Sequence, residues 1–471
     1  MRLATIVSLL LTLSANAVSR AADGPEFPFV GTIKPRAAQA IASSIWSIGG
    51  ETLDRDFAVY ANYKEFLGPL GAKAIRLQAG WAKCERKPGE YDWAWLDAIV
   101  DDARAQGVQP WLETSYGNPL YENGGGSGLG GRLPKSPQAL AAWDNWVRAL
   151  VRHFKDRVTE WEIWNEPDIS KSNTADAYAN LFMRTASIVR EEQPSARIYA
   201  LALAGNFKFA EAFLQQLKQA GKLHLMDAVT FHGYPKNPDD TSGTDTMRAL
   251  LAKYAPAAAA RQGETGAPSK FQSAFALSHL PWSETMQAKW DLRRMLAHRA
   301  KDVPFNLFTL MDMHYSRNGA LQMNWKGLLE AKPDKTVDHR KLSYFAVQRV
   351  FAIFDDTLER VRDFKPSASE GQIAVYAYRK KGGGGTVVTT WSKASPPADS
   401  NATSPVDLTI PGVPFAEPVY VDLLTGKVYA IPRERWSSVG SAVAFKQVPI
   451  YDSPVLIAEK AVLPLERKAT P

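Results

Sequence analysis

The carboxyl group of Glu166 stands where the chain changes direction, a position suited to acid chemistry. Glu166 is the sixth residue of the run Trp161-Glu-Ile-Trp-Asn-Glu-Pro-Asp168. The stretch from Arg157 onwards is too aromatic and β-branched for a surface helix, and Pro167 lacks the N–H that would continue a sheet ladder. We therefore predict a strand that ends at Glu166, a candidate catalytic acid. A purely structural role, as a helix cap or as the surface partner of an arginine, would give the same sequence.

Asn165-Glu166-Pro167 behind an aromatic strand resembles the acid/base signature of clan A, a large clan of retaining glycoside hydrolases on (β/α)8 barrels. The resemblance implies that Asn165 contacts the 2-hydroxyl of the sugar and that Glu166 protonates the leaving oxygen. A retaining enzyme also places a nucleophilic carboxylate about 5 to 5.5 Å from the acid. Gly263-Glu264-Thr265-Gly266 resembles the nucleophile strand of the clan, which implies that role for Glu264. Taken alone, Glu264 could equally be a capping or turn residue.

A scaffold must position both glutamates, and the hydrophobic pattern between residues 45 and 356 indicates one. Short apolar β-type runs alternate with stretches of helical periodicity, eight of each, which is typical of a (β/α)8 TIM barrel. The strand ends that carry Glu166 and Glu264, the fourth and the seventh, face each other in such a barrel. The seventh run is rich in alanine and is predicted from its position between two helical stretches. The predicted strands are 45–50, 72–81, 108–117, 158–166, 197–205, 228–235, 258–264 and 306–314.

Helical periodicity and capping residues place the main helices at about 91–105, 136–154, 173–193, 206–221, 241–255, 283–301 and 342–355. We predict the barrel over 37–356. Beyond Asp356 the pattern changes to alternating runs between Gly and Pro turns, which indicates a C-terminal antiparallel β-sandwich domain over 357–471. The segment 27–36 is expected to add a strand to it. The predicted strands of this domain are 372–378, 386–391, 406–410, 418–422, 427–431 and 455–458.

Active sites on such barrels lie at the C-terminal ends of the strands, so the polar and aromatic residues found there form one candidate sugar-binding set. Arg76 matches an arginine that clan A carries on strand two, and His232-Gly-Tyr234 resembles the strand-six element that orients the nucleophile. Arg76 could instead form a structural salt bridge, and His232 could be a core histidine. Besides Asn165, the predicted substrate-binding residues are Trp46, Arg76, Trp81, Tyr116, Asn118, His232, Tyr234, Asp312 and His314.

Other carboxylates near strand ends could compete for the catalytic roles. Glu162, deeper in its strand than Glu166, is expected to pair with Arg76 or another buried cation. Glu284 follows Ser283 and fits the negative bias of a first helical turn. The remaining rivals are Glu113, Glu160 and Asp312.

Composition narrows the function classes further. The 471 residues carry a formal net charge of +7 that is dispersed along the chain, so nucleic acid is not an expected partner. The apolar stretch 3–13 and the triplet Ala15-Asn-Ala17 predict a signal peptide over 1–22, and hence a secreted or periplasmic protein without a membrane span. Cys84 is the one cysteine, which excludes an intrachain disulfide. No His, Cys and Asp cluster has metal-ligand spacing, so we expect no metal and no cofactor.

Together these features predict a secreted retaining glycoside hydrolase, similar to clan A and most like family 39, that acts on a carbohydrate substrate. A catalytically silent carbohydrate-binding protein on the same barrel is the alternative. Family 39 includes β-xylosidases and α-L-iduronidases, and Gly263-Glu-Thr-Gly266 departs from the nucleophile surroundings of both. The sequence therefore names neither the sugar nor the linkage, and it leaves exo or endo action and the oligomeric state open. The glycine-rich stretch 124–131 lacks the Lys-Ser or Lys-Thr of a phosphate loop and is expected to be a mobile βα loop beside the cleft.

Overall fold

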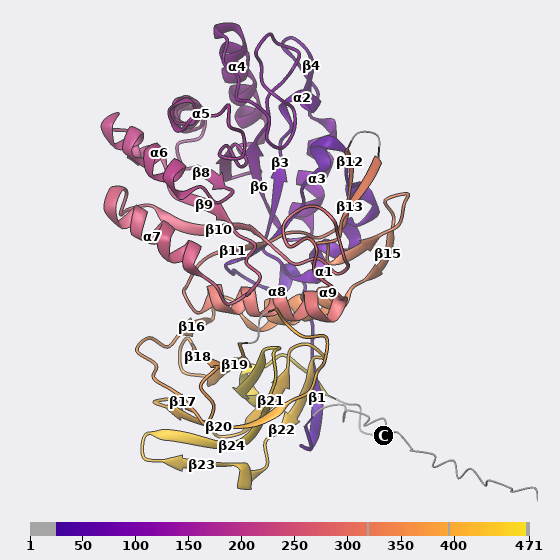
Figure 1. Ribbon diagram of the computed structural model, residues 1–471, viewed down its shortest axis with the longest axis vertical. Helices are drawn as coiled ribbons and strands as arrows, with labels where there is room; N and C mark the ends of the chain where they lie inside the picture. The colour runs from indigo at the N-terminus through magenta and orange to yellow at the C-terminus, as the bar shows by residue number, and fades with distance from the viewer. Residues whose placement is uncertain (1–24, 318–319, 394–395, 468–471) are drawn as a thin grey trace, which may run out of the picture.

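The computed structural model describes residues 25–317, 320–393 and 396–467. The predicted signal peptide, 1–22, lies outside the described residues. The protein folds into a closed barrel of parallel strands ringed by helices, with a second, antiparallel β domain packed below the barrel in the view of Figure 1. The predicted fold class is confirmed.

All eight predicted barrel strands are present, in the spatial order β10-β11-β2-β3-β6-β7-β8-β9. Even the alanine-rich seventh strand pairs with both neighbours, because every strand of a closed barrel gains two partners whatever its own propensity. The strands are β2 (Trp46–Gly49), β3 (Ala74–Gln78), β6 (Gln109–Thr114), β7 (Glu160–Ile163), β8 (Arg197–Leu203), β9 (Ala228–His232), β10 (Ala259–Thr265) and β11 (Phe305–Leu307).

The long helices follow the predicted ranges closely, and their ends follow the capping chemistry of the sequence. The side chain of Ser136 accepts the N–H of Ala139 at the start of α4, and Ser283 caps α8 in the same way. The long helices are α3 (Ala94–Ala105), α4 (Pro137–Phe154), α5 (Ala175–Glu192), α6 (Phe207–Gln219), α7 (Ser242–Tyr254), α8 (Glu284–Arg299) and α9 (Leu342–Ile353).

Two connections differ from the prediction of eight regular βα units. Between β2 and β3 there are only short 3-10 turns and the four-residue α1 (Leu67–Leu70), because Gly68 and Pro69 do not sustain a helix. After β3 the chain forms α2 (Trp81–Cys84) and the hairpin of β4 (Glu85–Lys87) and β5 (Glu90–Tyr91).

The eighth strand also differs from the prediction. It ends at Leu307 rather than at residue 314, and the chain then forms two antiparallel hairpins before α9. The first hairpin joins β12 (Met313–Arg317) to β13 (Ala320–Asn324), and the second joins β14 (Leu329–Ala331) to β15 (Val337–Arg340).

The C-terminal domain consists of an eight-stranded and a four-stranded antiparallel sheet, and every strand predicted for it is found. The N-terminal segment adds β1 (Phe29–Ile33) between β22 and β26, as expected from 27–36. The other strands are β16 (Leu358–Arg360), β17 (Ser367–Ala368), β18 (Ile373–Lys380), β19 (Thr386–Ser392), β20 (Ser404–Pro411), β21 (Pro418–Asp422), β22 (Lys427–Ala430), β23 (Trp436–Val439), β24 (Ala442–Ile450), β25 (Val455–Glu459) and β26 (Leu465–Arg467).

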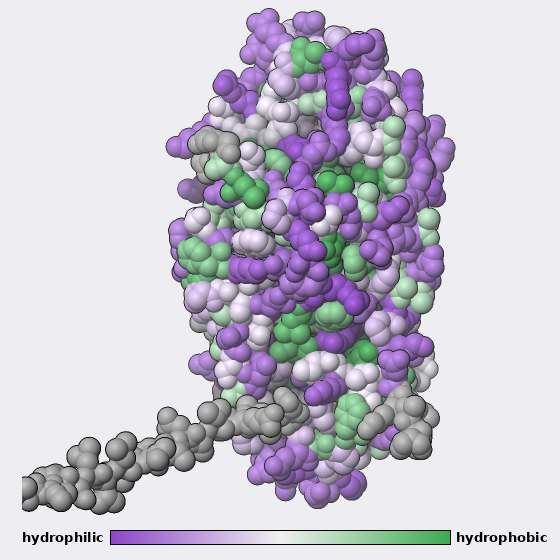
Figure 2. All heavy atoms as spheres, turned by 90° about the vertical axis from the view of Figure 1, so that its right-hand side faces the viewer, coloured by the Kyte–Doolittle hydropathy of each residue, from purple (hydrophilic) through white to green (hydrophobic). Residues whose placement is uncertain are grey.

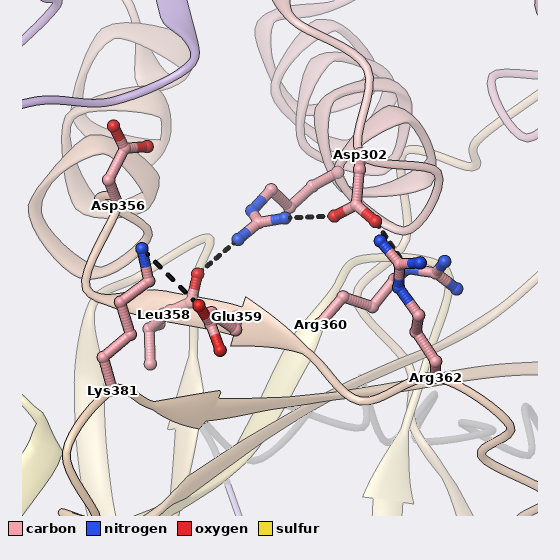
Figure 3. Close-up of a pocket in the computed structure, with 8 residues that line it drawn as sticks. Asp302, Asp356, Leu358, Glu359, Arg360, Arg362 and Lys381 are labelled. Atoms are coloured by element: carbon pink, nitrogen blue, oxygen red, sulfur yellow. Dashed lines mark hydrogen bonds and ion pairs between the residues drawn. The ribbon is translucent and has the colours of Figure 1, made fainter.

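Helices α8 and α9 separate the barrel strands from the β domain and carry most of the polar contacts between them (Figure 1). The buried Lys289 of α8 donates to Asp452 at 2.7 Å and to two backbone carbonyls of the β domain. A hollow of about 420 Å³ at this junction is shown in Figure 3. Asp302 pairs there with Arg299 at 2.8 Å and with Arg360 at 3.0 Å, so its charged groups bind each other across the junction.

The face shown in Figure 2 is mostly hydrophilic, with apolar residues in small separate groups. Among the described residues, none of the helices combines the length and apolar character needed to cross a membrane.

Candidate active site

Glu166 lies just beyond the end of β7, in a loop that is held by the neighbouring connection. Its backbone has a φ of 49° and that of Trp164 a φ of 65°, left-handed values that residues with side chains rarely adopt. The Glu166 N–H donates to the Ala202 carbonyl at 3.1 Å. The Asp168 carboxylate accepts the backbone N–H groups of residues 204–206 at 2.9 to 3.1 Å. These bonds fix the strained turn that presents Glu166, a feature that is common at active sites.

Glu264 lies near the end of β10, and two donors hold its carboxylate. The Tyr234 hydroxyl donates to Oε1 at 2.5 Å, and Arg76 Nη1 donates to Oε2 at 3.3 Å. The Glu264 side chain is 13% exposed. The carboxylate is therefore fixed in orientation but still open to a ligand, as a nucleophile must be.

His232, at the end of β9, lies between the two glutamates. Its Nδ1 is 2.7 Å from Glu166 Oε1 and 3.6 Å from Glu264 Oε2. The contacting oxygens of the two carboxylates and this nitrogen all lie within 4.8 Å of one another. The fourth and seventh strand ends thus bring one oxygen of each carboxylate close to the same imidazole nitrogen.

The floor of the site is Arg76, fully buried on β3. Its Nε donates to Glu162 at 2.7 Å, and its Nη1 donates to Glu51 at 2.8 Å as well as to Glu264. Nη2 donates to Glu113 and, at 2.9 Å, to Asn165 Oδ1. The predicted pairing of Glu162 with Arg76 is confirmed. All five N–H groups of the guanidinium are used, so Arg76 fixes the Glu264 carboxylate and the Asn165 side chain in one rigid frame.

Burial sets the protonation states around this frame. It raises the pKa of Glu166 to about 8, and the charge of Asp168 adds to the rise. The pKa of His232 is lowered by burial, which keeps its imidazole neutral at pH 7. Burial also raises the pKa of Glu51 to about 7 and that of Glu113 well above its usual range. Glu166 therefore carries a proton at neutral pH, as a general acid requires.

Asn165 and Tyr116 form the side of the site next to the acid. Asn165 Nδ2 donates to the Tyr116 hydroxyl at 2.7 Å, and Gln78 donates to the same oxygen at 3.2 Å. Asn165 is 4% exposed, and one hydrogen of its amide has no protein acceptor among these contacts. That hydrogen is the one available to a sugar hydroxyl.

Five of the predicted substrate-binding residues lie away from this group, and for them the prediction is corrected. Trp46 is the first residue of β2, where its indole donates to the Phe354 carbonyl at 2.6 Å in the core. Trp81 is fully buried in α2 and stacks on Tyr121, because β3 ends three residues before it.

The other three residues lie beyond the ends of their strands, in the connections that follow. Asn118 lies in the loop after β6, and its Nδ2 donates to the carbonyl of Glu85 in β4 at 2.8 Å. Asp312 and His314 lie beyond the true end of the eighth strand, where Asp312 pairs with the buried Lys341 at 2.7 Å. His314 is 6% exposed in β12, which belongs to the first hairpin and not to the barrel.

The rival carboxylates all have structural partners. Glu113 and Glu162 bind Arg76, and Glu160 binds Arg261 at 3.1 Å. Glu284 is the first residue of α8 and accepts the backbone N–H of residue 342 at 2.9 Å.

Sequence reasoning missed several residues at the site. Glu51, which shares Arg76 Nη1 with the nucleophile, follows the first strand and could have been found by the strand-end rule. Lys326, 2% exposed, lies with its Nζ 5.4 Å from the ring centre of Tyr234, and burial lowers its pKa to about 7. Tyr315 packs against Phe275, with ring centres 4.8 Å apart and the ring planes tilted by 50°. Lys326 and Tyr315 come from the unpredicted hairpin region, where no strand-end signal exists.

Two groups in the described residues bring metal-ligand atoms within 4.8 Å of one another: Glu166, His232 and Glu264, and Glu284, Glu330 and His339. In the second group Glu284 is bonded to His339 at 2.8 Å, and Glu330 to Lys270 at 2.6 Å. In both groups hydrogen bonds within the protein account for the convergence of the side chains.

Comparisons with known proteins agree with this geometry. The sequence model of glycosyl hydrolases family 39 matches residues 82–261, a stretch that contains Glu166 and ends before Glu264. A search of curated proteins gave no match.

Three solved structures illustrate the likeness in fold. A family 39 glycoside hydrolase from Bacteroides cellulosilyticus is 17% identical, with a TM-score of 0.63 over 89% of this chain and 81% of that one. A monomeric β-xylosidase from Caulobacter crescentus is 18% identical, with a TM-score of 0.60 over 91% and 97%. A family 39 enzyme from Xanthomonas axonopodis pv. citri is 16% identical, with a TM-score of 0.60 over 94% and 99%. With the family match and the shared barrel, the chain is a glycoside hydrolase that resembles family 39 of clan A.

Proposed function

We propose that this protein cleaves a glycosidic bond with retention of configuration, by double displacement through a covalent glycosyl-enzyme. The observation that supports this most directly is the separation of the two carboxylates, whose nearest contacting oxygens lie within 4.8 Å. An inverting enzyme needs room for a water molecule between the sugar and the second carboxylate, so a close approach of the two carboxylates favours the retaining arrangement.

In the first step the carboxylate of Glu264 attacks the anomeric carbon while Glu166 gives its proton to the leaving oxygen. The bond from the anomeric carbon to that oxygen breaks, and an ester bond to Glu264 forms. Arg76 and Tyr234 hold the nucleophile in line during this step. In the second step Glu166, now ionised, takes a proton from water. The water oxygen attacks the anomeric carbon, and Glu264 leaves as a carboxylate.

The experiment that tests this proposal is a panel of 4-nitrophenyl glycosides, beginning with the β-D-xyloside because one of the similar structures is a β-xylosidase. We expect turnover of one glycoside that is lost in Glu166→Gln and Glu264→Gln. Glu284→Gln, at a helix start outside the site, is the matched control and should keep its activity. Binding of a sugar without any turnover would instead support a silent carbohydrate-binding protein.

The stereochemical part has its own measurement. NMR of the earliest product should show the anomeric configuration of the substrate. Initial release of the opposite anomer would overturn the two-carboxylate retaining mechanism.

We also propose that the protein is exported, on the basis of the apolar stretch 3–13 followed by Ala15-Asn-Ala17. N-terminal sequencing of the exported protein should begin between Val18 and Asp23. An intact Met1 on exported protein would contradict a cleaved signal peptide.

A further inference from the structure

The largest hollow among those described at the carboxyl ends of the barrel strands is formed by two loops, one of which carries the acid, and neither catalytic carboxylate lines it. It has a volume of about 660 Å³ and is formed by the loop between β6 and α4 and the loop between β7 and α5. The second of these loops is the one that presents Glu166, and the Ile169 N–H in it donates to the Glu166 carbonyl at 3.2 Å. Ser170 and Ser172 of the same loop line the hollow. The same loop therefore carries the catalytic acid and part of the wall of the hollow.

One wall of the hollow is bare backbone, and the glycines of 124–131 make it so. A Cβ on Gly124 would lie 2.1 Å from the Asn118 carbonyl oxygen, and one on Gly125 would lie 2.3 Å from that of Arg132. Gly125 also has a φ of 90°. The backbone segments of this loop approach each other so closely that only glycine fits. The Gly117 N–H donates to the Gly126 carbonyl at 2.9 Å. The wall is thus flat, polar and rigidly held.

The rim of the hollow carries exposed apolar residues next to charged ones, since Glu122, Arg132 and Lys135 also line it. Eight large hydrophobic residues are exposed among the described residues, and three of them are chain neighbours of lining residues: Leu120 at 40%, Leu129 at 47% and Ile169 at 45%. Ile169 lies against Gly130, whose added Cβ would be 3.6 Å from its Cγ2. Polar side chains stand beside them, including Asn123, Ser170 and Ser172. A concave site that combines apolar contact with a few placed polar groups is suited to a ligand with both C–H faces and hydroxyl groups.

We propose that this hollow is a glycan-binding subsite for sugar residues beyond those at the scissile bond. The proposal rests on the glycosidase function above and specifies its substrate as an oligosaccharide or polysaccharide chain rather than a small glycoside. We assign the occupant from the position of the hollow. The loop after β7 carries Glu166 as well as Ser170 and Ser172 of the hollow, so a sugar chain that extends from the catalytic acid passes over this loop. The apolar rim contacts the sugar faces, and the backbone wall and the serines bind hydroxyl groups.

Two variants change the hollow without touching Glu166, Glu264 or their partners. Ser172→Trp places a large side chain at its edge, and Leu129→Ser removes part of its apolar rim. Both positions are exposed, so neither change disturbs the core. The matched control is Val439→Ser, an equally exposed apolar residue (58%) in the β domain.

The test compares two activities and one binding measurement on the full-length protein. With the 4-nitrophenyl monosaccharide that the panel identifies, kcat/KM should be the same in all variants. With the tetrasaccharide of the same sugar, kcat/KM should fall about tenfold in Ser172→Trp and Leu129→Ser, mainly through a higher KM, and stay unchanged in Val439→Ser. Equal loss on both substrates, or no loss on the tetrasaccharide, would overturn the proposal.

The binding measurement does not depend on turnover and so separates this proposal from the catalytic one. Native gels that contain soluble xylan, carboxymethylcellulose, pectin or alginate should retard the wild-type protein with at least one of these polymers. Retardation should weaken in the two hollow variants and persist in Val439→Ser. If no polymer retards the wild type, or if all variants are retarded equally, the hollow is not a glycan site, whatever the aryl glycosides show.

Discussion

At the scale of single residues, the proton on Glu166 is the quantity that links structure to rate. Because burial raises its pKa to about 8, the acid form dominates below pH 8 and disappears above it. We expect kcat/KM for a glycoside with a poor leaving group to fall above about pH 8. Glu166→Gln should lower that rate by roughly 10² to 10⁴. With a 2,4-dinitrophenyl leaving group, which needs little protonation, the first step should lose the alkaline limb. An alkaline limb near pH 5 would show that Glu166 is not held protonated by its surroundings.

The two glutamates should also respond differently to azide, because one forms the covalent bond and the other only moves protons. In Glu264→Gly, azide should enter from the side of the missing nucleophile and give a glycosyl azide of inverted configuration. In Glu166→Ala the covalent intermediate still forms, so azide should attack it from the opposite face and give the retained configuration. NMR of the azide products measures this.

The same azide anomer from both variants would contradict the assigned roles. So would near-wild-type turnover by Glu264→Gly, which would leave Glu51 as the next carboxylate in contact with Arg76 Nη1. Both Glu284 and Asp312 are excluded from that position by their contacts with α9 and Lys341.

Residue-level prediction succeeded where a strand end fixes a side chain and failed where a later loop decides its place. The contacts of Arg76, His232 and Tyr234 around the glutamates follow from their positions on β3 and β9 or directly after it. Trp81 was predicted to bind sugar because β3 was taken three residues too long. Lys326 lies between the two hairpins, where the sequence has no periodic pattern, so its position next to Tyr234 could be found only from the three-dimensional structure.

At the scale of elements, the loop after β7 depends on Asp168. Its carboxylate accepts three backbone N–H groups from residues 204–206, just before α6. Asp168→Ala should lower the free energy of unfolding by roughly 1 to 3 kcal/mol. Because Glu166 shares this turn, kcat should fall more than KM changes. Chemical denaturation and steady-state kinetics measure the two effects.

Asp176→Ala is the matched control, since Asp176 is an acid in the first turn of α5 just beyond the same loop. It should cost less than 1 kcal/mol and leave kcat unchanged. Equal effects of both substitutions would mean that Asp168 does not position the acid.

The elements themselves were predictable to different degrees for physical reasons. The long helices carry apolar stripes and capping serines that local sequence reveals, and even weak β10 could be placed by the regular alternation. β11 is only three residues long, and the hairpins after it resemble a continuous strand pattern. Pairing between non-adjacent segments decides such regions, and one sequence does not contain that information locally.

In the whole molecule, a fully buried lysine takes part in joining the β domain to the barrel. Lys289 on α8 is fully buried, and its ammonium binds Asp452 and two carbonyls of the β domain. β1 reaches from the N-terminal side of the barrel into the same domain, so both ends of the barrel sequence lead into it.

This arrangement predicts that Lys289 stabilises the protein without taking part in catalysis. Lys289→Met leaves Asp452 buried and unpaired and should cost about 3 to 5 kcal/mol of unfolding free energy. The double variant Lys289→Met/Asp452→Asn should recover much of that loss. Lys270→Met, which breaks the exposed pair with Glu330, should cost no more than about 1 kcal/mol. At 25 °C the folded Lys289 variant should keep the wild-type kcat, because its ammonium binds the β domain and neither Glu166 nor Glu264. A loss of kcat with unchanged stability would instead make the β domain part of the catalytic machinery.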